Sequence, residues 1–371
     1  MPRKAKILVF VEDPGPAAYA ALLLSVFERC NWGVVLCASG VAAKYLLKNG
    51  IEFIDAPPPE ESADLLSRIS PNCLLTGTAE NPDTLGLRLI VEARSANIPS
   101  VAFIDACMNS AYRFRGTTSD PLAYVADWLL VPDDWALRSF VDLGLSSERI
   151  VVCGHPQYDN IRARAKEWEL AGGVSTMRQR IFPSVPKDQR IITFISEGEH
   201  RFNLLPKATF ARFGFQGRGV DKGRTKIILE EVLDVVKECS RRPYVVFRAH
   251  PTEQTDGYIQ YGAEINYFSS DESPLELIYA SDLVVGMTSI LLLEAALLGR
   301  PTLAVLTQPS EVALLPNVRN GLTPHALTRH DLRKLLPSLL DANLVCAIRS
   351  MGDMLVADAA RRVTGALFGI I

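Results

Sequence analysis

The chain has 371 residues, 48% of them hydrophobic and 22% charged, with a formal net charge of −3. This composition is typical of a folded globular protein of about two domains. The slight acidic excess argues against a general nucleic-acid binder, which needs many cations to displace counterions. Seven scattered cysteines without a CxxC pair predict reduced thiols, a cytoplasmic location and no metal site.

No targeting or membrane-spanning segment is expected from the sequence. The apolar run at 7–11 is shorter than the core of a signal peptide. The longest apolar stretch, 283–299, is interrupted by Thr288, Ser289 and Glu294. It therefore predicts a buried strand and helix and not a membrane span, which needs about 20 mostly apolar residues.

Short β-rich runs alternate with longer helical runs through the first half of the chain. Helices are expected at 17–29, where apolar residues recur near helical spacing, and at 41–49, which Gly50 follows. The expected strands are Ile7–Val11, Val34–Ala38, Cys73–Thr76, Val101–Ile104, Trp128–Val131 and Ile150–Cys153. Short apolar strands joined by helices predict a parallel sheet that is covered on both faces.

The alternation breaks in a polar stretch at 161–190 and then restarts. Further strands are expected at Ile191–Ile195, Tyr244–Arg248, Asn266–Phe268, Leu283–Val285 and Thr302–Leu306, with helices at 226–239, 274–280, 290–298 and 330–340. We therefore predict an α/β fold of two Rossmann-like, doubly wound domains that face a central cleft. The expected parts are an N-terminal domain at 1–165, a linker at 166–190, a C-terminal domain at 191–345 and a helical segment at 346–371.

The segment at 197–224 lies between a predicted strand and its helix and is unusually long. Such loops usually have about 2–6 residues, and long ones are usually functional or mobile. It is rich in cations and glycines: Arg201, Lys207, Arg212, Gly214, Gly217, Arg218, Gly219, Lys222, Gly223 and Arg224. Two interpretations stay open, a solvated insertion or a lid whose cations close over an anionic ligand.

The second domain has the better equipment for binding an anion. Ligands of open parallel α/β sheets bind at the carboxyl ends of the strands, and there Gly286, Thr288 and Ser289 lead directly into the helix at 290–298. A helix N-terminus offers free N–H groups and partial positive charge to a phosphate. Capping of the helix is the alternative role for the two hydroxyls. Glu197 and Gly198 form a second turn that a diphosphate could approach.

Three more polar residues extend this predicted donor site. Arg248 and His250 flank one residue after a strand, and alternation places their side chains on the same side, where they could hold phosphate or a nucleobase. Glu294 lies one turn into an apolar helix, so its carboxylate needs partners such as ribose hydroxyls. Structural roles for His250 and Glu294 remain the alternative.

The first domain offers two candidate bases. Asp105 follows the strand that ends at Ile104, and Asp13 follows the first strand. Either carboxylate could remove a proton from an acceptor hydroxyl, or serve only as a helix cap or turn former. The sequence contains no GxGxxG, P-loop lysine or HExxH motif and no Ser-His-Asp order, which disfavours hydride transfer and P-loop hydrolysis.

Two groups of segments are distinctive. The first comprises Ala126–Pro132, Leu143-Gly144 and Ile150–Pro156, and the second comprises Ala280–Val285, Thr288-Ser289 and Leu293–Pro301. Together they resemble the GT-B superfamily, nearest to the group of UDP-N-acetylglucosamine 2-epimerases, lipid-A-disaccharide synthase and CDP-glycerol glycerophosphotransferases. The first group is similar to the end of their N-terminal domain and the second to their nucleotide-sugar half. The resemblance spans about 1–345 and implies the GT-B fold.

The match to the epimerases is incomplete at the residues that carry their chemistry. Phe103, Asp105 and Asn109 stand where the similar epimerase segment has a histidine, a catalytic glutamate and an arginine, and Thr78 stands where another acid is expected. The PEE-x-NR run is missing after Arg113. Epimerisation needs several acid–base groups, so the resemblance favours a different reaction.

The second domain also departs from the pattern. Met287 stands where the epimerases and the glycerophosphate transferases have aspartate, and where retaining transferases have the first of two glutamates. His250-Pro251, by contrast, matches the His-Pro pair that transferases of CDP-glycerol and CMP-sugars use on the donor phosphate. Donors linked to UDP and to CDP or CMP therefore both stay open.

The resemblance implies a glycosyltransferase that moves a sugar or sugar-like group from a nucleotide-activated donor to an unknown acceptor, in surface-glycan or glycoconjugate biosynthesis. A UDP-N-acetylglucosamine 2-epimerase or sugar-nucleotide hydrolase, and a non-catalytic nucleotide-sugar-binding protein, are the alternatives. We expect no metal and no cofactor apart from the donor. Nucleic acid is not an expected partner, the basic segment leaves peripheral membrane contact open, and the oligomeric state is not predicted.

Overall fold

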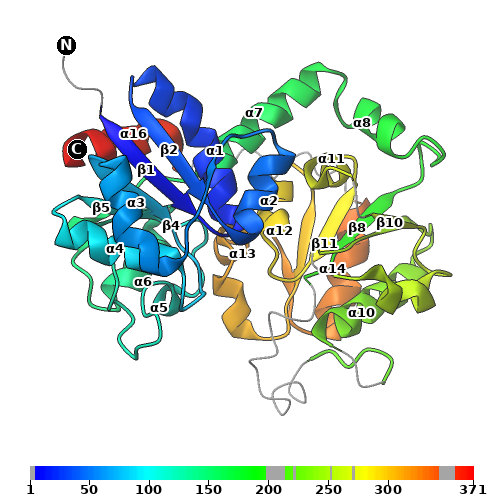
Figure 1. Cartoon of the computed structure of the whole chain (residues 1–371). Helices are drawn as coiled ribbons and strands as arrows, with labels where there is room; N and C mark the ends of the chain where they lie inside the picture. The colour runs from blue at the N-terminus through cyan, green and yellow to red at the C-terminus, as the bar shows by residue number, and fades with distance from the viewer. Residues whose placement is uncertain (1–4, 198–213, 220–222, 251–252, 270–271, 342–355) are drawn as a thin grey trace. The chain divides into compact units, whose positions relative to one another are not determined.

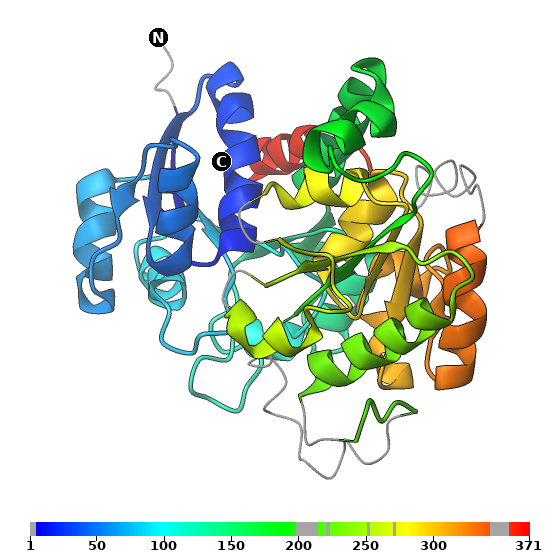
Figure 2. The same cartoon turned by 90° about the vertical axis from the view of Figure 1, so that its right-hand side faces the viewer.

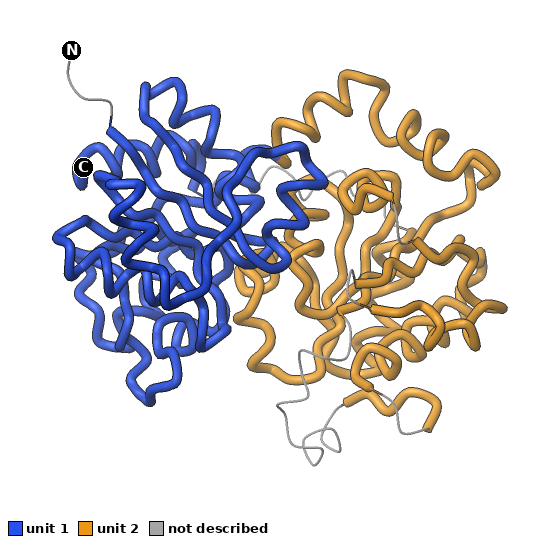
Figure 3. Tube along the Cα trace, viewed as in Figure 1, with its two compact units in different colours: residues 1–160, 355–371 blue, residues 161–354 orange. Residues whose placement is uncertain are grey.

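Two parallel sheets, one of seven strands and one of six, organise the chain (Figure 1). The structure, a computed structural model, describes residues 5–197, 214–219, 223–250, 253–269, 272–341 and 356–371. The chain divides into unit 1, residues 1–160 with 355–371, and unit 2, residues 161–354 (Figure 3). Each unit contains one of the sheets.

The sheet of unit 1 has the strand order β3-β2-β1-β4-β5-β6-β7, and every pair is parallel. Its strands are β1 (Lys6–Val11), β2 (Gly33–Ala38), β3 (Ile54–Asp55), β4 (Cys73–Gly77), β5 (Ser100–Phe103), β6 (Trp128–Val131) and β7 (Ile150–Val152). The chain runs outward from β1 in one direction and returns through β4 in the other. The order therefore reverses between β1 and β4, which is the position where doubly wound sheets bind ligands.

Helices cover both faces of this sheet, so the central strands are buried on both sides. The helices are α1 (Pro14–Arg29), α2 (Gly40–Lys48), α3 (Ser62–Ile69), α4 (Leu85–Ser95), α5 (Ser110–Arg113), α6 (Asp134–Val141) and α16 (Ala359–Ile370). Alternate strand residues enter two separate cores. Ile7 and Val9 belong to the one under α1, and Leu8 and Phe10 to the one under α4.

The last helix, α16, belongs to unit 1 although nearly 200 residues of unit 2 precede it. Val363 and Leu367 pack into the core beside α1, and α16 lies against α1 in both views (Figures 1 and 2). The main-chain N–H of Ala359 donates to the Asp159 carboxylate over 2.8 Å. The segment predicted as a separate C-terminal part is therefore, where the structure describes it, a helix of unit 1.

Unit 2 repeats the same winding with six parallel strands in the order β10-β9-β8-β11-β12-β13. Its strands are β8 (Ile191–Ile195), β9 (Tyr244–Arg248), β10 (Tyr267–Ser269), β11 (Leu283–Gly286), β12 (Thr302–Val305) and β13 (His325–Ala326). Its helices are α8 (Gly173–Ile181), α10 (Arg224–Glu238), α11 (Pro274–Tyr279), α12 (Ile290–Leu297), α13 (Pro316–Arg319) and α14 (Arg329–Asp341). Here the order reverses between β8 and β11.

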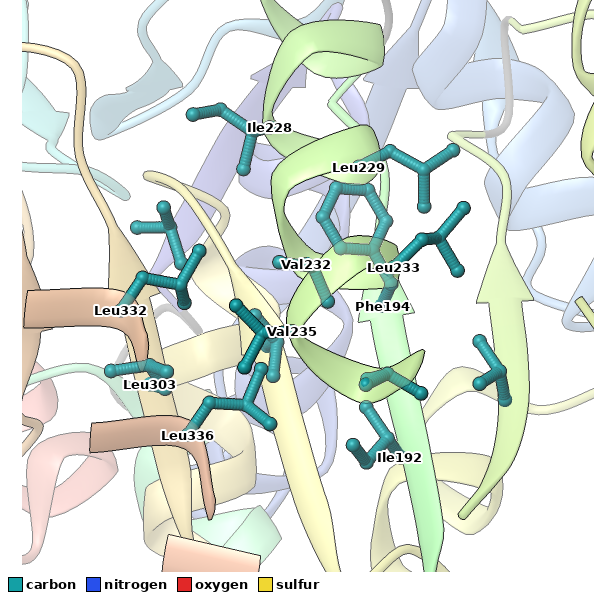
Figure 4. Packing of buried hydrophobic residues seen from close by; sticks show 14 of the residues in the cluster. Ile192, Phe194, Ile228, Leu229, Val232, Leu233, Val235, Leu303, Leu332 and Leu336 are labelled. Carbon is teal, nitrogen blue, oxygen red and sulfur yellow. The ribbon is translucent and has the colours of Figure 1, made fainter. Parts of the chain in front are cut away.

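One face of the unit 2 sheet is covered by α10 and α14, which lie side by side (Figures 1 and 2). Figure 4 shows the apolar side of α10, including Ile228 and Val232, directed toward Phe194 of β8, with Leu332 and Leu336 of α14 in the same layer. The apolar residues of α10 recur at helical spacing, so this core holds the helix in position. The position of Arg224, its first residue, follows from that packing.

The stretch predicted as a linker, 166–190, contains the end of α7 and all of α8, and it belongs to unit 2. Helix α7 (Pro156–Leu170) runs from unit 1 into unit 2, and α8 follows after Gly172 and Gly173, which have positive φ. Trp168 contacts Tyr279 of α11 with ring centroids 5.1 Å apart. The sequence shows that this stretch is polar, but it does not show the contact of Trp168 with α11. The division between the units, after residue 160, therefore differs from the boundary predicted at 165.

The prediction of two Rossmann-like, doubly wound domains is confirmed. The strands expected at 128–131, 191–195 and 244–248 agree with the observed bounds, and the other predicted strands are within one or two residues of theirs. The two-residue edge strands β3 and β13 were not predicted, because two residues are too few to give an alternating pattern.

Candidate functional site

The carboxyl ends of β8 and β11 are neighbours at the point where the strand order of unit 2 reverses. Glu197 follows β8, and Thr288 follows β11 just before α12. The structure brings these two predicted residues into direct contact. The Thr288 hydroxyl donates to Glu197 Oε2 over 2.9 Å, and the Thr288 main-chain N–H donates to Glu197 Oε1. A carboxylate of the chain therefore occupies the approach to α12 that was predicted for phosphate.

Arg224, the first residue of α10, completes this contact. Its guanidinium donates to Glu197 Oε2 over 3.1 Å and to Glu311 Oε1 over 2.7 Å. Glu311 in turn accepts from the main-chain N–H of Thr307 over 2.7 Å. Glu197 is 7% exposed and Arg224 5%, so this is a buried cation between two buried carboxylates.

Opposing effects act on the pKa of Glu197. Burial raises it, while the Arg224 charge and the two Thr288 hydrogen bonds lower it, and the net direction is upward. Every polar atom of the carboxylate has a partner inside unit 2. The arrangement thus ties the ends of β8 and β11 to the start of α10.

The sequence analysis did not find Glu311 and treated Arg224 as a lid cation. The position of Arg224 directly before an amphipathic helix was the available signal, because the first turn of a helix is fixed by its core. Arg218, another predicted lid cation, also forms its hydrogen bonds within unit 2. It donates to Asp234 and Glu264, each over 2.7 Å, and these bonds raise its pKa. Gly198, Arg201, Lys207, Arg212 and Lys222 lie outside the described residues.

The start of α12 is otherwise built as a helix terminus at the edge of the sheet. Ser289 is the N-cap, and its hydroxyl accepts from the Leu291 N–H over 3.4 Å. Ile290, the first helical residue, is 42% exposed, so the tip of the helix is not covered within unit 2. Gly286 is buried against Leu292, and Glu294 is buried one turn into α12.

Arg248 and His250 follow β9 and have different neighbours. Arg248 donates to the Ser269 hydroxyl over 3.0 Å and lies 3.9 Å from the Glu272 carboxylate. The His250 main-chain N–H donates over 3.2 Å to Glu253, which also accepts from Ser196. Carboxylates of the protein, Glu253 and Glu272, therefore lie next to the N–H, hydroxyl and guanidinium groups at this end of β8 and β9 as well.

In unit 1, Asp105 follows β5 and lies at the start of α1. Its Oδ1 accepts from Arg113, 3.3 Å away. Its Oδ2 lies next to Gly15, where a Cβ would come within 2.2 Å of that oxygen. The Asp105 side chain is 18% exposed, more than its arginine partner at 6%. A carboxylate with one fixed oxygen and partial solvent access fits the chemistry predicted for Asp105.

Asp13, the rival candidate, precedes α1 as its N-cap residue. Its side chain makes no capping hydrogen bond to the first turn, and it is half-buried. The next three residues are Pro14, Gly15 and Pro16, so only Gly15 carries a main-chain N–H among them. The N-terminus of α1 is thus poorly equipped to hold a phosphate.

His155 is a functional candidate that the sequence analysis missed. It follows β7, hydrogen-bonds to the main chain of Asp105, and accepts from the Gln157 N–H at Nδ1 over 3.1 Å. Burial lowers its pKa to about 4. The neutral imidazole lies 4.9 Å from the ring of Tyr19, centroid to centroid. The sequence analysis used the segment Cys153–Pro156 only as part of the family resemblance. That resemblance did not predict the contact between His155 and Asp105.

Among the residues that the structure describes, no group of three or more His, Cys, Asp or Glu side chains is arranged to hold a metal ion. No helix in the same ranges is long and apolar enough to cross a bilayer.

Comparison with known proteins gives matches at the level of structure. No family model matches the sequence, and no curated protein matches it. Among solved structures, UDP-GlcNAc 2-epimerase from Neisseria meningitidis bound to UDP-GlcNAc is similar with a TM-score of 0.68 and 14% identity, over 98% of this chain and 100% of that one. The chain has the GT-B fold.

Two further GT-B structures match along their whole length. S. aureus MnaA with UDP has a TM-score of 0.67 and 13% identity, over 99% of this chain and 98% of that one. HepE from Anabaena in complex with UDP-glucose has a TM-score of 0.63 and 12% identity, over 98% of this chain and 99% of that one. The expected resemblance is confirmed at the level of the GT-B fold, and UDP-GlcNAc 2-epimerases are among the similar structures.

Proposed function

We propose that the chain is an enzyme that transfers a sugar or sugar-like group from a nucleotide-activated donor to a hydroxyl acceptor. The observation that carries this proposal is the full-length likeness to structures that hold UDP, UDP-glucose or UDP-GlcNAc. We place it in surface-glycan or glycoconjugate biosynthesis and in the cytoplasm. It would need no metal and no cofactor beyond the donor.

The donor would bind at the carboxyl ends of the unit 2 strands. Thr288, Ser289 and Gly286 lie at the end of β11, and Arg248 and His250 at the end of β9. The uncovered tip of α12 at Ile290, beside the position that Glu197 occupies, would provide partial positive charge for the donor phosphates. Glu294 remains the candidate for a ribose. The likeness to UDP-bound structures favours UDP over CDP or CMP as the nucleotide.

Asp105 would act as the base on the acceptor. The acceptor hydroxyl gives its proton to the Asp105 carboxylate while its oxygen bonds to the anomeric carbon of the donor. The bond from that carbon to the phosphate oxygen breaks, and the nucleotide leaves with the electron pair. Asp105 fits this role better than Asp13, because Arg113 and Gly15 define the positions of its two oxygens.

Epimerisation or hydrolysis of a sugar nucleotide is the second candidate, because several of the matched structures, among them the one from Neisseria meningitidis, are UDP-GlcNAc 2-epimerases by name. The missing acids at Thr78 and Met287 count against epimerisation. A non-catalytic nucleotide-sugar-binding protein is the third.

Two measurements test the proposal. A thermal-shift panel of UDP, CDP, CMP, GDP and dTDP should give the largest stabilisation with UDP, about 2.7 kcal/mol at 100 times its dissociation constant. Incubation with UDP-GlcNAc alone should yield no epimer, since an epimerase needs no acceptor. Accumulation of the epimer would replace transfer by the second candidate, and UDP binding without any turnover would favour the third.

A further inference from the structure

Arg113 is unusual because almost all of its hydrogen-bond donors are used inside unit 1. It is 5% exposed. It donates to the main-chain oxygens of Ala106 and Met108 over 3.0 and 3.1 Å, to the Thr78 hydroxyl over 2.6 Å and to Asp105 Oδ1 over 3.3 Å. Four of its five N–H groups are thus used inside unit 1. Arg113 is therefore not a ligand for an anionic substrate.

The two main-chain contacts fix where Arg113 lies relative to Asp105. Ala106 and Met108 directly follow Asp105, so the guanidinium is anchored to the same loop that carries the carboxylate. Because the guanidinium is planar and rigid, anchoring two edges leaves Oδ1 with one defined partner. Rotation of the Asp105 carboxylate would break this ion pair, so its second oxygen is held in one direction too.

That second oxygen, Oδ2, lies against Gly15 in the first turn of α1. A Cβ at residue 15 would be 2.2 Å from Oδ2 and 3.2 Å from Cγ of Asp105, both far inside contact distance. Only glycine leaves room for the carboxylate at this position. Gly15 belongs to the first turn of α1, a helix of 16 residues, so Oδ2 lies beside the start of that helix.

We propose that Arg113 and Gly15 are positioning residues for Asp105. Arg113 binds Oδ1, which leaves Oδ2 as the oxygen that takes the acceptor proton, and the missing side chain at Gly15 provides the space in which Oδ2 lies. This inference rests on the proposed function, in which Asp105 is the base. It adds the oxygen that reacts and the two residues that hold it.

The first test is a double-mutant cycle for stability, which does not depend on activity. Gly15→Ala should lower the folding equilibrium constant about tenfold, because the new methyl group overlaps the carboxylate. The same change should cost much less in an Asp105→Ala background, where the overlap is absent. Gly365→Ala in α16 is the control, since nothing lies within 4 Å of its Cβ position. Equal costs of Gly15→Ala in both backgrounds would overturn the inference.

The second test measures UDP released from UDP-glucose in the presence of a panel of hydroxyl acceptors, after subtraction of the release with water alone. Arg113→Met should lower kcat at least tenfold, while the dissociation constant for UDP stays the same, because Arg113 only orients the base. Arg113→Lys should recover part of kcat, and circular dichroism checks that each variant folds. A kcat for Arg113→Met equal to that of the wild type would overturn the inference alone. A wild-type protein that binds UDP but releases none from UDP-glucose would overturn the proposed function and the inference together.

Discussion

Each unit places a carboxylate with an arginine partner at the start of a helix, but the two carboxylates differ in how far they are exposed. In unit 1, Asp105 lies at the start of α1 with Arg113 as its partner, and in unit 2, Glu197 lies at the start of α12 with Arg224. The Asp105 side chain is 18% exposed and that of Glu197 is 8%. The carboxylate of unit 1 is partly exposed, and that of unit 2 is satisfied within the protein.

The helices themselves differ in the same sense. The first turn of α1 contains two prolines, so it has few N–H groups to offer, whereas α12 begins at Ile290 after the N-cap Ser289 and has an exposed first residue. The same winding therefore holds a partly exposed carboxylate at the start of α1 and a buried carboxylate at the start of α12.

The largest effect is expected on turnover when Asp105 is changed. Asp105→Asn should lower donor turnover by about 10²–10⁴, because an amide cannot take the acceptor proton. Asp133→Asn is a matched control, since Asp133 follows the neighbouring strand β6 and caps α6 through the Ala136 N–H. Steady-state release of UDP measures both. Equal losses in the two variants would remove the special role of Asp105.

The next largest effect is expected on the stability of unit 2. Arg224→Met should reduce the free energy of unfolding by about 3–5 kcal/mol, because Glu197 and Glu311 would remain buried without their cation. Arg333→Met is the control, since Arg333 and Glu238 form an exposed pair at 3.5 Å that should contribute less than about 1 kcal/mol. Urea titrations compare the two. A small loss for Arg224→Met would mean that the unit 2 carboxylates are not structural.

His155 should make the stability of unit 1 depend on pH. Its pKa is about 4 in the folded protein and about 6.5 when unfolded. Between these values the unfolded chain binds the extra proton, so stability falls as pH drops from about 6.5 to 4, by about 3 kcal/mol in total. His155→Gln removes the titrating group, and the difference between the two unfolding free energies should change across this window. A constant difference would contradict the low pKa.

The smallest effects concern the caps of the two helices. Ser289→Ala should cost about 1 kcal/mol, because its hydroxyl accepts from the first turn of α12. Asp13→Ala should cost less, since the Asp13 side chain makes no such bond in α1. Thermal unfolding of both variants measures the difference, and a larger cost at Asp13 would reverse this part of the comparison.

Much of the fold was predictable because its strands are short, apolar and bounded by turn residues. The meeting of Glu197 with Thr288 was foreseeable in outline, since both follow strands of one sheet. The partners that decide their roles were not. Arg224 is 87 residues from Glu311, and local patterning carries no signal for a contact over that separation.

The same limit applies in unit 1. The sequence placed Asp105 after a strand, but the approach of Gly15 depends on how closely α1 packs on the sheet. Arg113 was noticed only as the point where a family motif is missing. Its anchoring to Ala106 and Met108 follows from the conformation of one loop, which no periodicity encodes.

The return of the chain to unit 1 at α16 bears on synthesis at the ribosome. Val363 and Leu367 fill the core beside α1, so unit 1 lacks part of its interior until the final residues emerge. Unit 2 needs no such late contribution and can close first. Fragments that stop near residue 160 should expose the apolar side of α1. Joining 355–371 ahead of residue 5 through a short linker should allow unit 1 to fold without unit 2.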